Sequence, residues 1–159
     1  PCMEEAAKTV AEIIEIAIQR EMEAFFFYDD LIARVEDPQT KETLQWVAEE
    51  EKKHRRFLVD YRDGRFGDAA LRMAATVDYK LAEYMAEPES GGQVTRESVF
   101  LIAAHREKRS HRFYTELARL HPDAKVQGIL ERMASEELRH KEKMEYLYAN
   151  VAFPQTDGG

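Results

Sequence analysis

Apolar positions recur three and four residues apart in four long stretches of the chain, which is the spacing of one face of an α-helix. The stretches lie at about 10–35, 38–63, 96–120 and 123–150. Residues typical of helix starts precede three of them: a possible capping box from Thr9 to Glu12, the pair Asp37 and Pro38, and Thr95. The pattern therefore predicts four long amphipathic helices.

Residues 65–94 separate the second long helix from the third. They contain a shorter helical pattern, from about Asp68 to Met85, and then a helix-breaking sequence that begins at Pro88. An up-down-up-down bundle needs only a short loop here, whereas a long connection can travel along the bundle and let the second and third helices run parallel. We therefore expect an all-α protein: a ferritin-like four-helix bundle of two antiparallel hairpins joined by a long crossover with a short helix, in a single domain over residues 1–159.

The two predicted hairpins repeat each other at an offset of 86 residues. The pairs that match in residue type are Glu21 and Glu107, Phe27 and Phe113, Tyr28 and Tyr114, Ala48 and Ala134, Glu50 and Glu136, Glu51 and Glu137, and His54 and His140. Few of the exposed positions match in this way. The repeat therefore marks the side chains that both hairpins need.

Four glutamates of the repeat lie inside the apolar stripes of their helices. Glu21 follows Ile18 by three positions and precedes Phe25 by four, so all three side chains share one face. The other three glutamates with such neighbours are Glu51, Glu107 and Glu137. Each of the four is predicted to point its carboxylate into the core.

The same glutamates pair across the predicted turns. In an antiparallel hairpin, residues equally far from the turn lie at the same height along the bundle. Glu21 and Glu51 have their midpoint at position 36, and Glu107 and Glu137 have theirs at position 122. Both midpoints fall at predicted turns, so each hairpin brings two core-facing carboxylates level.

Four ionised carboxylates in one apolar bundle repel one another and lose hydration, so a compensating charge is required. Two divalent cations balance four carboxylates, and a histidine three positions after a glutamate in each hairpin adds a nitrogen ligand on the same face. Mixed carboxylate and imidazole ligands suit iron or manganese, and zinc would also bind. We predict a di-metal site with these ligands: Glu21, Glu51, His54, Glu107, Glu137 and His140.

Composition excludes several other classes of function. The formal net charge is −8 and no long Lys/Arg run is present, which argues against binding to nucleic acid. No apolar run is long enough to span a membrane, and the first residues lack the apolar core of a signal peptide. The single cysteine, Cys2, cannot form an internal disulfide. We therefore expect a soluble protein of the reducing cytoplasm.

At the repeated residues the chain resembles the rubrerythrin-like branch of the ferritin-like di-iron proteins, over about residues 10–150. The resemblance rests on the two glutamates that precede Phe-Tyr pairs and on the two Glu-x-x-His motifs. It implies two iron ions, with manganese, a mixed manganese and iron pair, or zinc as alternatives. It also implies that Glu51 and Glu137 bridge the metals and that Glu21 and Glu107 are terminal ligands. Hydrogen bonds to the ligands are then expected from Tyr28 and Tyr114.

The resemblance implies a peroxidase-type oxidoreductase with a role in oxidative stress. Such a protein reduces hydrogen peroxide or dioxygen with electrons from an external donor, such as a rubredoxin-type protein. The alternative is an iron-handling ferroxidase or storage-type protein without peroxidase turnover. A homodimer or higher homo-oligomer is expected in either case.

The chain also departs from this family and its relatives. Rubrerythrins proper carry a rubredoxin domain with four cysteines, and this chain has one. The family's additional carboxylate, one turn after the glutamate of the third long helix, falls at Ser110. Bacterioferritins have a haem-binding methionine where Lys52 stands, and the tail after Asn150 is too short for the fifth helix of a ferritin cage.

Several positions keep a second interpretation at this point. Glu50 and Glu136 adjoin the predicted ligands and could replace them, although the spacing to the histidines and the apolar flanks favour Glu51 and Glu137. Residues interpreted as having no ligand role are His105 and His111 on the polar face or near the site, His121 at a helix end, and Phe25, Phe26, Phe27 and Trp46 in packing. A helical module without metal remains the simplest alternative function.

Overall fold

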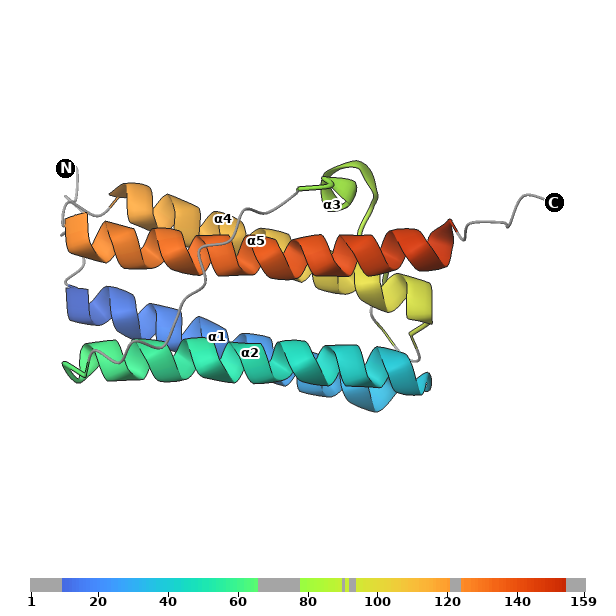
Figure 1. Ribbon diagram of the computed structural model, residues 1–159, viewed down its shortest axis with the longest axis horizontal. Coiled ribbons are helices and arrows are strands. Elements are labelled where there is room, and N and C mark those ends of the chain that lie inside the picture. The colour runs from blue at the N-terminus through green and yellow to red at the C-terminus, as the bar shows by residue number, and fades with distance from the viewer. Residues whose placement is uncertain (1–9, 66–77, 90, 92–93, 121–123, 154–159) are drawn as a thin grey trace, which may run out of the picture.

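The computed structural model describes residues 10–65, 78–89, 91, 94–120 and 124–153. Its helices are α1 (Val10–Arg34), α2 (Pro38–Arg62), α3 (Leu81–Tyr84), α4 (Arg96–Leu120) and α5 (Ala124–Ala152). Helix α1 packs against α2 and α4 against α5, and α2 and α4 run in the same direction along the bundle (Figure 1). The expected all-α bundle of two antiparallel hairpins is confirmed.

Two long helices begin at the capping residues that the sequence predicts. The carboxylate of Asp37 accepts hydrogen bonds from the backbone N–H of Thr40 at 2.8 Å and from its hydroxyl at 2.7 Å, with Pro38 in the first turn of α2. The hydroxyl of Thr95 accepts from the N–H of Ser98 at 3.1 Å at the start of α4. Each such cap contributes about 1 kcal/mol because it satisfies an otherwise free N–H group. The predicted capping box at Thr9 lies outside the described residues.

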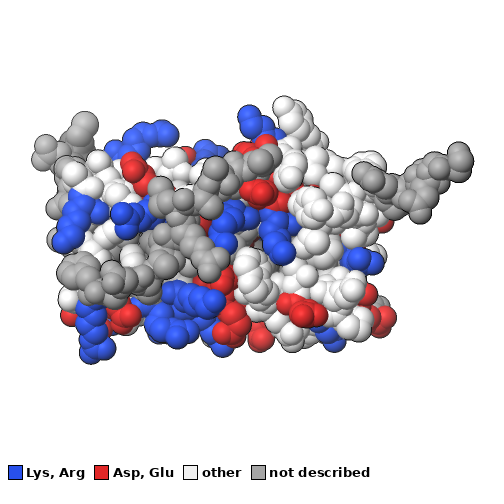
Figure 2. Space-filling view, viewed as in Figure 1, with Lys and Arg blue, Asp and Glu red and all other residues white. Residues whose placement is uncertain are grey.

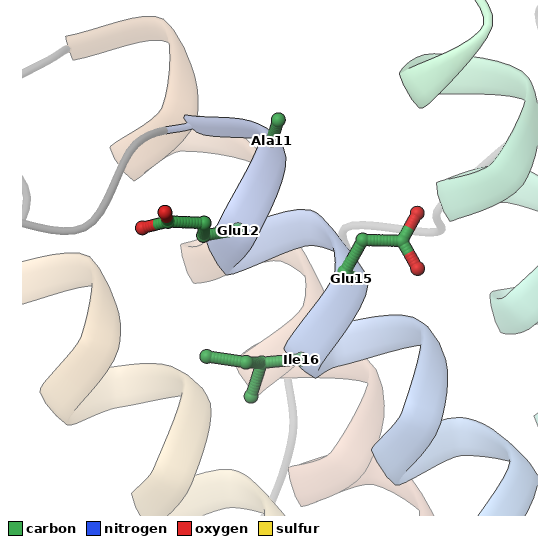
Figure 3. Close-up of a pocket in the computed structure, with 4 residues that line it drawn as sticks. All are labelled: Ala11, Glu12, Glu15 and Ile16. Carbon is green, nitrogen blue, oxygen red and sulfur yellow. The ribbon is translucent and has the colours of Figure 1, made fainter.

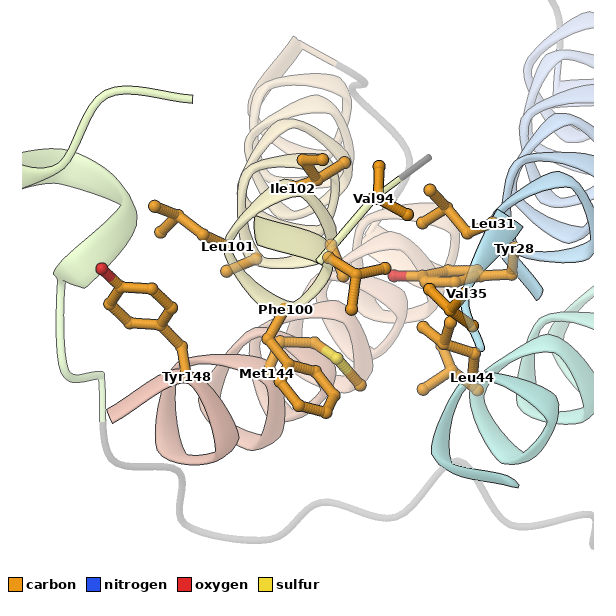
Figure 4. Packing of buried hydrophobic residues seen from close by; sticks show 14 of the residues in the cluster. Tyr28, Leu31, Val35, Leu44, Val94, Phe100, Leu101, Ile102, Met144 and Tyr148 are labelled. Carbon is orange, nitrogen blue, oxygen red and sulfur yellow. The ribbon is translucent and has the colours of Figure 1, made fainter. Parts of the chain in front are cut away.

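The crossover contains a short helix, as expected, but its described part is shorter than the predicted stretch. The predicted helix covers about 68–85, of which 68–77 lie outside the described residues, and α3 occupies only Leu81–Tyr84. Helix α3 is fixed to α5 by the N–H of Ala82, which donates to Glu145 at 2.8 Å. Tyr148 of α5 also points toward α3 (Figure 4).

Two apolar clusters fill the core, one on each side of a polar layer. The first cluster includes Leu31, Val35, Leu44, Phe100 and Met144 (Figure 4), and the second includes Ile14, Ile18, Leu58, Val126 and Leu130. Along every long helix, the predicted glutamate ligand lies between residues of the two clusters. Apolar packing therefore separates the polar layer from both ends of the bundle.

Aromatic residues that the sequence assigns to packing divide into two groups. Phe25 and Phe27 are partly buried against the first cluster, whereas Phe26 is 59% exposed and Trp46 is 39% exposed. Phe26 therefore does not pack in the core, whereas Trp46 packs at the surface against His140 and remains partly exposed. Successive helical residues point about 100° apart, so three consecutive phenylalanines cannot all face the core.

Basic and acidic side chains are interspersed over the face of the molecule that carries α2 and α5 (Figure 2). This mixture is typical of a solvated helical surface. Of the helices in the described ranges, none combines the length and the apolar character that crossing a membrane requires.

Candidate metal centre

The six predicted ligands form the polar layer in the middle of the bundle. Each of the four long helices supplies one glutamate, and α2 and α5 each add a histidine one turn further on: Glu21, Glu51, Glu107, Glu137, His54 and His140. All six side chains are buried, with exposed fractions of 3% or less. Residues far apart in the sequence therefore meet in one small, water-poor region.

These side chains form two overlapping sets that could each hold one cation. The sets are Glu21, Glu51, His54 and Glu137, and Glu51, Glu107, Glu137 and His140. Within each set, one oxygen or nitrogen atom per residue lies within 4.8 Å of all the others. The two sets share Glu51 and Glu137, which are the residues that the resemblance assigns as bridging ligands.

The Nδ1 atoms of the two histidines face these carboxylates. Nδ1 of His54 lies 3.4 Å from Glu137 and 3.7 Å from Glu21. Nδ1 of His140 lies 3.1 Å from Glu51 and 3.7 Å from Glu107. Each histidine therefore offers the same ring nitrogen to a different set.

Unpartnered polar atoms test whether this region suits metal ions. Buried atoms without a hydrogen bond include Oε2 of Glu21, Glu51 and Glu107, and Nδ1 of His54. A buried acceptor without a partner costs about 1 to 3 kcal/mol, and more when it is charged. Carboxylate oxygens and an imidazole nitrogen that converge in this way are the donor set of a divalent cation. The residues present therefore fit two divalent cations.

The carboxylates of the shared ligands have strongly perturbed pKa values. Burial, together with the negative charges of Glu21 and Glu107, raises the pKa of Glu51 to about 7. Burial and the charges of Glu51 and Glu21 also raise the pKa of Glu137 well above its ordinary range. Without metal, these two carboxyl groups therefore retain protons at pH values where an exposed glutamate is ionised.

The two terminal carboxylates are shifted in the opposite direction. Burial would raise the pKa of Glu21, but the neighbouring Glu51 and His54 side chains and the hydrogen bond from Tyr114 outweigh it and hold the pKa at about 2. Burial likewise opposes ionisation of Glu107, whose pKa is nevertheless lowered, mainly by the nearby ring of His140. The layer thus separates its carboxylates into two ionised and two protonated groups.

Each terminal carboxylate accepts a hydrogen bond from a tyrosine of the other hairpin. The hydroxyl of Tyr28 in α1 donates to Oε1 of Glu107 in α4, and the hydroxyl of Tyr114 in α4 donates to Oε1 of Glu21 in α1 at 2.5 Å. Burial, followed by the neighbouring carboxylate charge, raises the pKa of both tyrosines well above the usual value. Both hydroxyls therefore stay protonated and serve as donors.

Glu136 contacts His54 from the opposite side of its ring, and Glu50 lies nearby. Oε2 of Glu136 lies 3.4 Å from Nε2 of His54, and the Glu136 side chain is only 3% exposed. The carboxylate of Glu50 accepts from Lys53 at 2.9 Å and from Arg139 at 3.3 Å. Together with the two histidines, the two glutamates form a third set of possible ligands: Glu50, His54, Glu136 and His140.

The sequence left Glu136 as a second candidate ligand beside Glu137, and the structure places its carboxylate beside His54. Glu50 and Glu136 are themselves a matched pair of the 86-residue repeat. A repeat that retains both members of each Glu-Glu pair indicates that both are needed. Glu51 and Glu137 belong to both of the first two sets, one of which includes Glu21. Glu136 instead lies beside Nε2 of His54.

The other histidines lie away from these sets. Nε2 of His105 contacts the carbonyl oxygen of Met85 at 2.9 Å, and Nδ1 of His111 contacts that of Ala134 at 2.8 Å. Neither belongs to a possible metal-binding group within the described ranges. His121 lies outside the described residues. Ser110, at the position of the family's additional carboxylate, is buried with 5% of its surface exposed.

A further acidic cluster has a cation of its own. Asp78, Glu83 and Glu145 surround the ammonium group of Lys141, at 2.6, 3.1 and 3.0 Å. This lysine is 1% exposed and joins the crossover to α5. The sequence did not indicate the cluster because Lys141 and Glu145 align with Arg55 and Val59 in the repeat, so the two hairpins differ here.

A surface hollow of about 440 Å³ lies away from the polar layer, at the beginning of α1. It is lined by Ala11, Glu12, Glu15 and Ile16 (Figure 3). The side chains of Glu12 and Glu15 point to different sides of the helix there. None of the predicted ligands lines this hollow.

Comparison with known proteins agrees with the geometry of the polar layer. The model of the rubrerythrin family matches residues 12–148, which is most of the chain and includes all six predicted ligands. The searches of curated proteins and of solved structures gave no significant match. Because the match spans both hairpins and the crossover, the chain belongs to the rubrerythrin family.

Proposed function

We propose that this protein is a di-iron oxidoreductase that reduces hydrogen peroxide or dioxygen with electrons from an external donor. The observation that supports it best is the buried layer of four glutamates and two histidines, in two sets that share Glu51 and Glu137. Membership of the rubrerythrin family supports a pair of metals at this place. Iron is favoured because carboxylate and imidazole ligands in these proportions suit it, with manganese the nearest alternative.

The proposed ligand roles follow from the two sets. Glu51 and Glu137 would be shared by both cations, Glu21 and His54 would complete the ligands of one, and Glu107 and His140 those of the other. A reduced iron pair would supply two electrons to a bound oxidant. The burial of the six residues would limit the contact of that pair with water.

Tyr28 and Tyr114 orient two of these ligands. Each hydroxyl donates to one oxygen, Oε1, of a terminal carboxylate, which leaves Oε2 of Glu107 and of Glu21 for a metal. Partners of this kind fix the direction of a ligand and commonly change metal affinity by 10- to 100-fold. The two tyrosines therefore prepare the terminal carboxylates before metal binds.

The electrons for turnover come from another molecule in this proposal. A rubredoxin-type centre requires four cysteines, and the chain has only Cys2. A separate one-electron carrier, such as a rubredoxin-type protein, would supply the two electrons that each peroxide consumes. Two protons from solvent complete the conversion of one hydrogen peroxide into two water molecules.

Anaerobic loading with Fe(II) tests the proposal directly. The protein should bind two irons per chain, and addition of peroxide should produce an absorption band in the near ultraviolet. Peroxide consumption should then continue when a reduced one-electron donor is supplied. Failure to bind two irons, or the lack of any spectral change with peroxide, would contradict the proposal.

A matched pair of variants connects the result to the site. The double variant Glu51→Ala with Glu137→Ala removes both shared ligands, whereas Glu49→Ala with Glu142→Ala removes glutamates that belong to neither set. Only the first should lose iron binding. Iron uptake far beyond two per chain without peroxide turnover would indicate ferroxidase or storage function instead.

A further inference from the structure

The buried position of the ligands raises the question of how electrons reach them. All six have exposed fractions of 3% or less, so a donor protein at the surface cannot touch any of them. A side chain that both contacts a ligand and reaches the surface would shorten the path for electron transfer between proteins. This question rests on the proposed function, since only a redox-active metal pair needs an electron donor.

Trp46 meets both conditions. It is the only tryptophan of the chain, lies in α2 and is 39% exposed. Its ring stands edge-on to that of His140, with 5.8 Å between the ring centroids and 75° between the planes. The imidazole of His140 is fully buried and presents Nδ1 to the carboxylates. An aromatic contact thus leads from the surface to a predicted ligand.

The contact continues from His140 to the second histidine. The rings of His140 and His54 are stacked, with 5.2 Å between centroids and 10° between planes. Of the two sets that share Glu51 and Glu137, one contains His54 and the other contains His140. Trp46, His140 and His54 therefore form a row of three aromatic rings that runs from the surface past both metal positions.

The contact of an exposed aromatic ring with a predicted histidine ligand is present in only one half of the repeat. Adding 86 to position 46 gives position 132, where the second hairpin has the exposed residue Arg132. Arginine has no aromatic ring, so His54 lacks the corresponding contact from the second hairpin. The site is symmetric in its ligands but asymmetric in its access from the surface.

A positive charge lies beside the exposed indole. Nζ of Lys143 is 5.3 Å from the centroid of the Trp46 ring. Cations at this distance are attracted to the face of an indole. The indole therefore carries a cation over its face, and this positive charge suits the approach of a reduced, negatively charged carrier.

We infer that Trp46 is the contact through which an external one-electron donor reduces the metal pair, by way of His140. Each donor molecule gives up one electron, and two such transfers return the oxidised pair to its reduced state. The indole gains and loses no net electron, because it serves only as the path. Trp46 is thus a positioning residue for electron transfer and has no contact with the oxidant.

Reduction kinetics without turnover test the inference. The iron-loaded protein is first oxidised with one equivalent of peroxide. It is then mixed anaerobically with a reduced one-iron iron–sulfur protein, and stopped flow follows the loss of the near-ultraviolet band. Trp46→Leu removes the ring, and Trp46→Phe retains an aromatic ring. Reduction should slow by about tenfold or more in Trp46→Leu because the path loses a direct contact, and by much less in Trp46→Phe.

Two controls separate this effect from general damage. Phe26→Leu removes another exposed aromatic residue, whose ring contacts Phe25 and not a ligand, and should reduce at the wild-type rate. Oxidation of the reduced protein by peroxide should be equally fast in all variants. Equal reduction rates for the wild type and Trp46→Leu would overturn the inference while leaving the proposed function intact. A wild-type protein without the near-ultraviolet band would overturn both.

Fluorescence provides a second test that needs no variant. Because Trp46 is the only tryptophan, selectively excited indole emission reports on this residue alone. Binding of Co(II), a paramagnetic ion, should quench that emission in proportion to occupancy and reach a plateau at two ions per chain. Emission unchanged at full occupancy would show that Trp46 does not contact the metal ligands, and would overturn the inference.

Discussion

Tyr114 of α4 donates a hydrogen bond of 2.5 Å to Glu21 of α1, and so joins the two hairpins at the buried polar layer. The repeat supplies the reciprocal bond from Tyr28 of α1 to Glu107 of α4. Each hairpin therefore orients a carboxylate of the other. Because a buried carboxylate without partners is costly, neither hairpin can form a satisfied half-site alone.

Removing one of these hydroxyls should weaken metal binding. In Tyr114→Phe the packing is retained, but Oε1 of Glu21 loses its donor and the carboxylate can rotate. We expect the affinity for the first or second metal to fall by about 10- to 100-fold. Titration with Co(II), followed by its visible absorption, measures this. Tyr146→Phe, at an exposed residue of α5, should bind metal normally. Equal affinities in both variants would disprove an orienting role for Tyr114.

Compared with the wild type, a variant at a shared glutamate should be equally or more stable without metal and less stable with metal. Glu51→Gln is nearly isosteric and removes a carboxyl group from a crowded, buried acidic layer. Without metal, the variant should unfold at the same or a higher temperature than the wild type, because repulsion and desolvation are relieved. With metal, the wild type should gain more stability, because binding stabilises the folded state by mass action. Thermal unfolding with and without Co(II) tests this crossing, and destabilisation of similar size under both conditions would contradict it.

The stability of the metal-free protein should fall as pH rises toward neutrality. The folded-state pKa of Glu51 is about 7, above the ordinary value of 4.5. Its contribution to stability is therefore fully present below pH 4.5 and is lost as pH rises through about 7. The low pKa of Glu21, about 2, acts only in more acidic solution, where its contribution is lost as pH falls. Urea unfolding of metal-free protein between pH 5 and about 8 measures this trend. Stability that rises over this interval would contradict the assignment.

Metal affinity should show the opposite dependence on pH. Protons on Glu51 and Glu137 compete with the cations, so each binding event expels protons and becomes more favourable as pH rises through about 7. Calorimetric titration in two buffers with different enthalpies of ionisation gives the number of protons released. Glu51→Gln should release fewer protons than the wild type. Binding heats that are identical in the two buffers would count against proton release.

The buried Lys141 should be required to hold the crossover on α5. Replacement by Met leaves the buried carboxylate of Glu145 without its cation, which should cost about 3 kcal/mol of unfolding free energy. Arg55→Met, at the matching position of the other hairpin, changes an exposed side chain and should cost little. A Lys141→Met, Glu145→Leu double variant should recover part of the loss. Urea unfolding of these variants tests the coupling, which would be disproved if the two single variants were equally stable.

The helices and the orientation of the glutamates could be predicted because both depend on local periodicity. A side chain that falls three or four residues from apolar neighbours on a helix must share their face, whatever surrounds the helix. The burial of Glu21 and Glu107 follows from this rule. The offset of 86 residues then showed that two hairpins carry the same set, and the caps at Asp37 and Thr95 fixed where two helices begin.

Only the tertiary structure decided which residues meet across the bundle. The contact of Glu136 with His54, the cluster around Lys141 and the edge-on contact of Trp46 with His140 each join different helices. Such contacts depend on how helices rotate and pack against one another, and helical spacing within one segment carries no information about that. The sequence by itself therefore determined which faces turn inward and which residues are candidate metal ligands, and the packing of the hairpins determined which side chains meet, including Trp46 and His140.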